Sequence, residues 1–142
     1  MSSRFRNCIT KRYLRRCAID ENKVRREIVE AKNDLESSKI SLKESNYKWA
    51  IIQAYFSMFH ACKSLLYSVG YDEKSHDCVI IAVEELFTDS GKLPSSIVSN
   101  IRNAKNARQA ADYGCTYGIN AAQGIIQDAE DAYRIILSYH NI

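Results

Sequence analysis

A chain of 142 residues fits one domain, which can bury a core without metal ions or disulfides, and is too short for two ordinary domains. Apolar residues make up 46% of the chain and charged residues 26%, a balance that excludes a disordered chain. Five glycines and one proline leave long stretches without a helix breaker. We therefore expect an all-α fold, an up-and-down bundle of four to five helices joined by short loops.

Charge is distributed unevenly along the chain. Residues 1–26 contain nine Lys or Arg and two carboxylates, a net charge of +7, whereas residues 27–142 have a net charge of −4. We divide the chain into a basic N-terminal arm, residues 1–19, and a helical domain, residues 20–142. The arm either contacts nucleic acid through its charge or is a solvated, frayed terminus.

The five cysteines are odd in number, form no C-x-x-C pair and follow no recognisable signal peptide. Unpaired thiols are typical of a reducing compartment, so the sequence predicts a soluble cytoplasmic protein. The most apolar stretch, residues 47–69, is interrupted by Lys48, Gln53, His60 and Lys63, which argues against a membrane span.

The first helix is expected over residues 20–44. Apolar and small side chains recur there at alternating steps of four and three, which draws one narrow stripe: Val24, Ile28, Ala31, Leu35, Ser38 and Leu42. Asp20 at its start suits the helix dipole, and Asn46 is a good N-cap for the helix that follows.

The second helix is expected over residues 47–69, with Gly70 as its stop. It is apolar nearly all round, which is typical of a central helix with neighbours on several sides. One polar line runs along it: Gln53, Ser57, His60 and Ser64. Three more helices are expected over residues 75–88, 94–111 and 120–139, and residues 112–118 form a loop.

The fourth of these helices has a cation where its apolar stripe continues. The stripe runs through Ile97, Ile101 and Ala104. The next position of the same pattern is Arg108, which therefore faces inward, where an arginine needs a partner or a wet cleft. Two interpretations remain open: Asp112 closes the helix end as an ion pair, or Arg108 faces a groove and binds phosphate.

Two histidines also stand out, each either a satisfied structural residue or part of a site. His60 lies in the polar line of the central helix, and His76 lies near the start of the third helix. The H-x-C pairs that they form with Cys62 and Cys78 suggest zinc, but residues two apart on a helix point about 200° apart. No P-loop, dinucleotide-binding or zinc-protease motif is present. We expect no metal and no cofactor.

Several segments, taken in order, resemble the HEPN domain. Residues 54–66 read A-Y-F-S-M-F-H-A-C-K-S-L-L, and residues 108–114 read R-Q-A-A-D-Y-G. Between them lie Gly70, the Ser-His pair at 75–76 and G-K-L-P at 91–94. The similarity covers about residues 20–140 and is closest to a branch with A-Y-(Y/F)-(A/S)-M-F-H-A and R-x-x-x-D-Y-G segments.

The resemblance implies a homodimeric helical bundle in a prokaryotic cell, encoded beside a minimal nucleotidyltransferase as a toxin–antitoxin pair. It also implies that many members are metal-independent ribonucleases, whose R-x(4–6)-H residues meet across the dimer cleft. Some partners attach nucleotides to a tyrosine in the signature region, which makes Tyr113 a candidate for modification.

The sequence departs from that signature. No histidine follows Arg108 at the required spacing, and Asp112 and Tyr113 occupy that stretch. The only literal match is Arg134-x5-His140, at the end of the last helix, where the two side chains would lie about 120° apart around the helix axis.

Our leading hypothesis is a non-enzymatic or weakly active HEPN domain that binds a nucleotide, RNA or a nucleotidyltransferase. Its expected cleft is lined by five residues: Arg108, Asp112, Tyr113, His60 and His76. One alternative is an endoribonuclease toxin that uses Arg108 with an unconventional base such as His60 or His76. The other is a structural interaction bundle in which the Arg108–Asp112 pair only ties helices together.

Overall fold

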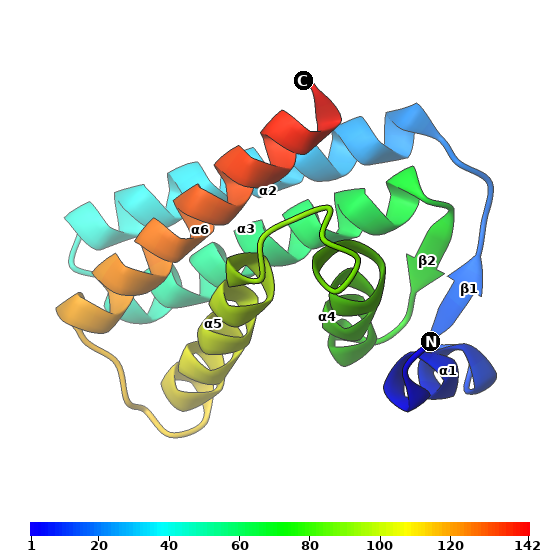
Figure 1. Cartoon of the computed structure of the whole chain (residues 1–142). Coiled ribbons are helices and arrows are strands. Elements are labelled where there is room, and N and C mark those ends of the chain that lie inside the picture. The colour runs from blue at the N-terminus through cyan, green and yellow to red at the C-terminus, as the bar shows by residue number, and fades with distance from the viewer.

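The computed structural model describes residues 1–142, and Figure 1 shows the whole chain. Its elements are α1 (Ser3–Thr10), β1 (Leu14–Arg16), α2 (Glu21–Lys43), α3 (Tyr47–Ser68), β2 (Tyr71–Glu73), α4 (His76–Val83), the π-helical turn η1 (Glu84–Thr88), α5 (Ser96–Asp112) and α6 (Ile119–His140). The expected all-α bundle is confirmed, because the two strands are only three residues each.

Helix α3 is the centre of the bundle, as its all-round apolar sequence predicted. Helices α2 and α6 pack along one side of it, and α4 and α5 lie on the other (Figure 1). Many of its large side chains are almost completely buried, among them Tyr55, Met58, Leu65 and Leu66. None of the helices combines the length and the apolar character that crossing a bilayer requires.

The helix ends follow local chemistry. The Asp20 carboxylate accepts a hydrogen bond from the backbone N–H of Asn22, 2.9 Å away, and so caps α2. The Ser75 hydroxyl caps α4 in the same way. Gly70, which follows α3, has a φ of +81°, a conformation that side chains with a Cβ rarely adopt.

Helix α4 passes directly into η1, a kind of turn that is rare in proteins. Glu84 at the start of η1 forms two hydrogen bonds with Arg102 of α5, at 3.0 and 3.1 Å. This paired contact fixes the end of α4 against α5.

The basic N-terminal segment is ordered against the bundle, in contrast to a solvated, frayed terminus. Phe5 and Leu14 are each 1% exposed. Strand β1 pairs antiparallel with β2, with Leu14 opposite Glu73 and Arg16 opposite Tyr71. The two strands are far apart in the sequence, so no local residue pattern predicts that they pair.

The expectation of five unpaired thiols is wrong. Cys8 of α1 and Cys78 of α4 form a disulfide, and Cys17, Cys62 and Cys115 are free. The folding of α1 onto α4 brings the pair together across a separation of 70 residues. The cytoplasmic assignment rested on unpaired thiols and therefore loses that support.

Candidate functional site

Arg108 lies in α5 within the buried stripe of that helix, between Ala104 and Ala111. Its side chain is 28% exposed, and its guanidinium carbon lies 5.1 Å from the ring centre of Tyr55 and 4.8 Å from that of Phe56. Its Nε lies 3.5 Å from the Asp112 carboxylate. Two aromatic rings and one carboxylate therefore compensate for the partial burial of the cation.

His76, at the start of α4, lies against the same aromatic side chains. Its Nδ1 is 2.9 Å from the Tyr55 hydroxyl, and its ring centre is 4.0 Å from that of Phe59. Burial lowers the pKa of His76; Glu73 opposes this shift, and the charge of Arg108 adds to it. His76 is therefore a neutral imidazole near pH 7. We call Arg108, Asp112, Tyr55, Phe56 and His76 the Arg108 cluster.

The direction of the hydrogen bond between Tyr55 and His76 depends on the imidazole tautomer. Tyr55 is fully buried, and burial raises the pKa of its hydroxyl to about 12, against the opposing charge of Arg108. The hydroxyl thus keeps its proton, and in the tautomer that is protonated at Nε2 it donates to Nδ1 of His76. The ring proton then lies on Nε2, which has no hydrogen-bond partner within the chain. The Arg108 cluster consequently offers donors, a guanidinium and an N–H, rather than a free base.

His60 contacts other residues than the Arg108 cluster does. Its Nδ1 lies 2.6 Å from the buried Glu27 carboxylate, and its Nε2 lies 3.7 Å from Asp34, both on α2. Lys63 continues the chain of charges, 3.8 Å from Glu27 and 3.3 Å from Glu73. No ion pair or hydrogen bond joins His60 to the Arg108 cluster, so His60 ties α3 to α2.

The remaining sequence candidates are dispersed. Tyr113 follows the end of α5 and is 83% exposed. Arg134 is 66% exposed and faces Glu130 and Asp131 of its own helix. His140 instead bonds the Ser64 hydroxyl at 2.9 Å. The structure thus brings Arg108, Asp112 and His76 together, and it leaves His60, Tyr113 and the Arg134–His140 pair outside that group.

Sequence reasoning missed Tyr55, Phe56 and Lys105 as neighbours of the site. Lys105 lies one turn before Arg108 on α5 and also acts on His76, whose pKa its charge lowers. The three-residue spacing of Lys105 and Arg108 was a usable signal. No sequence pattern indicated that Arg108 lies over the rings of Tyr55 and Phe56, because this contact depends on how α3 and α5 pack.

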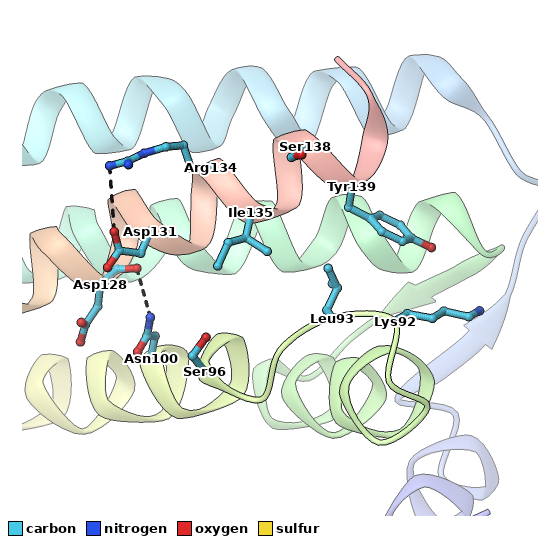
Figure 2. A pocket seen from close by; sticks show the side chains of 10 residues that line it. All are labelled: Lys92, Leu93, Ser96, Asn100, Asp128, Asp131, Arg134, Ile135, Ser138 and Tyr139. Carbon is cyan, nitrogen blue, oxygen red and sulfur yellow. Dashed lines mark hydrogen bonds and ion pairs between the residues drawn. The ribbon is translucent and has the colours of Figure 1, made fainter.

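The largest hollow of the molecule lies elsewhere, between α5 and α6 (Figure 2). It has a volume of about 830 Å³, and Leu93 and Ile135 project into it. Its polar groups already face each other: Asn100 donates to the backbone of Asp128 at 3.4 Å, and Arg134 lies 4.0 Å from Asp131. No residue of the Arg108 cluster lines it.

A second, smaller hollow of about 240 Å³ is lined in part by Asp77, which follows His76 in the sequence. We call it the α4 groove, because α4 forms its floor and residues of α1 and α5 form its two walls. No group of three or more His, Cys, Asp or Glu side chains is clustered as a metal site would require.

Comparison of the sequence with known proteins identifies its family and several relatives. The family model of the HEPN domain matches residues 24–142. The chain is 32% identical over 92 residues to "Putative toxin MJ0142" of Methanocaldococcus jannaschii, which is 65% of this chain and 63% of that protein. The match therefore spans less than two thirds of that relative.

Two further relatives match over more of their length. "Putative toxin MJ0605" of the same organism is 30% identical over 101 residues, 70% of this chain and 75% of that protein. A "UPF0332 protein" of Archaeoglobus fulgidus is 30% identical over 114 residues, 79% of this chain and 89% of that protein.

Proposed function

Because this chain belongs to the HEPN domain family, related to proteins named as toxins, we propose that it binds RNA through a phosphate group at the Arg108 cluster, without efficient cleavage. A phosphate oxygen is an acceptor, and the cluster presents donors with few acceptors of its own. A free nucleotide also carries phosphate oxygens and would bind the same donors.

The observation that supports this proposal most is the Tyr55–His76 hydrogen bond beside Arg108. Cleavage without metal needs a base that takes the proton of the 2′-hydroxyl and a cation that stabilises the phosphorane. Arg108 supplies the cation. His76 uses Nδ1 as the acceptor of the Tyr55 proton, so Nε2–H is set to donate, and Asp112 is already paired with Arg108.

The test uses purified full-length protein, a fluorescently labelled single-stranded RNA and a metal chelator. We expect RNA binding by anisotropy and intact RNA on a gel. Arg108→Ala should weaken binding about tenfold or more, because a charged hydrogen bond contributes roughly 1.5–3 kcal/mol. Arg134→Ala is the matched control, since it removes an exposed arginine from another helix.

The outcomes of this test separate the three hypotheses. Unchanged binding in Arg108→Ala together with a lower melting temperature would mean that the Arg108–Asp112 pair only ties helices together. RNA cleavage by the wild type that Arg108→Ala abolishes would establish a nuclease in place of a binding protein.

A metal-independent endoribonuclease remains the second candidate, because His76 lies in the Arg108 cluster of a single chain. A neutral imidazole near pH 7 has the right protonation state for a base once Tyr55 releases Nδ1. On this alternative, cleavage would be lost in both His76→Gln and Arg108→Ala and kept in His60→Gln. The proposal of binding alone predicts no cleavage in any of the four proteins.

We further propose that the protein forms a homodimer. Its antitoxin-type partner would be a minimal nucleotidyltransferase, and both proteins would act in the cytoplasm of a prokaryotic cell. Figure 1 shows that α2 turns into α3 and α6 begins at the same end of the bundle. Large apolar side chains are exposed in these segments: Ile40, Trp49, Tyr117 and Ile119. Mass measurement by light scattering should give twice the chain mass, and Trp49→Glu should reduce it. A monomer at micromolar concentration would contradict the homodimer.

A further inference from the structure

The α4 groove has a positively charged lining. Arg4 contributes from α1, and Arg102 and Lys105 contribute from α5. Asp77 is the only carboxylate among the lining residues, so the lining has two more positive than negative charges. Such a surface favours an anionic partner.

The groove lies beside the Arg108 cluster. Asp77 follows His76 on α4, and Lys105 lies three residues before Arg108 on α5. Arg102, Lys105 and Arg108 are about 4.5 Å apart along the helix axis and each is turned by about 60° from the one before, so the three cations form a curved row around α5. Lys105 lines the groove, and its charge also acts on His76. Cations spread along such a row suit a linear polyanion better than a single small anion.

The wall made by α1 lies outside the part of the chain that the HEPN family model matches, which begins at residue 24. The Cys8–Cys78 disulfide holds α1 on α4, and Phe5 of α1 packs edge-on against Tyr71 of β2. These contacts fix Arg4 at the groove. The second wall of the groove therefore comes from a segment outside the matched residues.

We propose that the α4 groove is the path along which a single-stranded RNA runs to the Arg108 cluster, with α1 as one of its walls. The inference rests on the proposed function. The Lys105–Asp77 pair in the groove is replaceable, because the Asp77 side chain is 66% exposed and exposed pairs contribute about 0–1 kcal/mol. An RNA phosphate takes the place of the carboxylate. Arg102 keeps its paired contact with Glu84 and contributes the remaining charge of its guanidinium.

Arg4→Gln is the most direct test, because Arg4 forms no ion pair whose loss would complicate the result. With the labelled RNA oligomer we expect binding several-fold weaker, and a slope of log affinity against log salt smaller by about one, since one phosphate contact is lost. Arg6→Gln is the matched control, an exposed arginine of the same helix that does not line the groove. With a mononucleotide in place of the oligomer, Arg4→Gln should have no effect.

Asp77→Asn tests the sign of the effect. Removing the only carboxylate of the lining should tighten RNA binding several-fold, an outcome that a merely structural role of Asp77 does not give. Lys105→Gln should weaken binding as Arg4→Gln does.

Failure of this inference differs from failure of the proposed function. If Arg108→Ala weakens RNA binding while Arg4→Gln, Lys105→Gln and Asp77→Asn leave it unchanged, RNA binds at the cluster and not along the groove. If Arg108→Ala itself has no effect, the proposed function fails. If polyglutamate of equal charge competes as well as RNA, the groove is a surface for an acidic protein segment and the inference is overturned.

Discussion

Arg108 lies where two kinds of contact converge, two aromatic faces and a carboxylate, and the half-buried His76 packs against the same rings. A guanidinium that is only 28% exposed needs such compensation, and its weak hydration makes stacking on rings favourable. The same features leave part of the cation available, because Asp112 occupies it through Nε alone. At this scale the cluster is a structural contact whose exposed part is available to the phosphate group that we propose it binds.

The histidines make stability depend on pH. Burial lowers the pKa of His76 and of His140 below the ordinary value. As pH falls below about 6.5 the unfolded chain takes up protons that the folded chain does not, so the free energy of unfolding falls. We expect denaturant midpoints to decrease between pH 7.5 and 5, and less so in His76→Gln. An equal decrease in wild type and His76→Gln would contradict the assignment.

At the scale of elements, the N-terminal unit of α1 and β1 depends on long-range contacts. The backbone N–H of Cys17 donates to the Gly70 carbonyl oxygen at 2.8 Å, and β1 pairs with β2 just beyond. Neither contact can be predicted from local periodicity, whereas the helices that carry a complete apolar stripe can. The boundaries of α2, α3 and α6 accordingly agree with the sequence-based ranges to within one residue.

Gly70 offers a measurable test of this packing. A Cβ at Gly70 would lie 2.9 Å from the Cys17 carbonyl oxygen, in addition to the cost of a φ of +81°. Gly91→Ala is the matched control, because Gly91 has a φ of +82° and open space around it. We expect Gly91→Ala to lower the free energy of unfolding by about 1–2 kcal/mol, and Gly70→Ala to lower it clearly more. Equal losses in urea titrations would mean that β1 does not pack as described.

The disulfide makes a second prediction for the N-terminal unit. It closes a loop of 70 residues, so its removal should lower the free energy of unfolding by about 4 kcal/mol. Cys78→Ser and Cys8→Ser should each show this loss, and Cys115→Ser, at an exposed free thiol, should not. Labelling of both Cys8 and Cys78 by a thiol reagent in the folded, unreduced protein would refute the bond.

The whole molecule is a helical bundle of the HEPN family, and α1 and β1 lie outside the residues that the family model matches. The bundle was predictable because helical periodicity and few breakers suffice to define it. Arg108 and Asp112 were predictable as a pair because they lie on one helix. The position of His76 beside them was not predictable, since it depends on how α4 packs against α3 and α5. The disulfide and the α4 groove were not predictable either.

The most direct test of RNA binding at the Arg108 cluster is an NMR titration of side-chain nitrogens with a short single-stranded RNA. We expect the resonances of Arg108 Nε and His76 Nε2 to shift together and to saturate, while those of Arg134 and His60 stay in place. The His76 signals should also report an unprotonated Nδ1 before and after binding. Shifts confined to Arg134, or none at Arg108 when RNA is bound, would contradict the account.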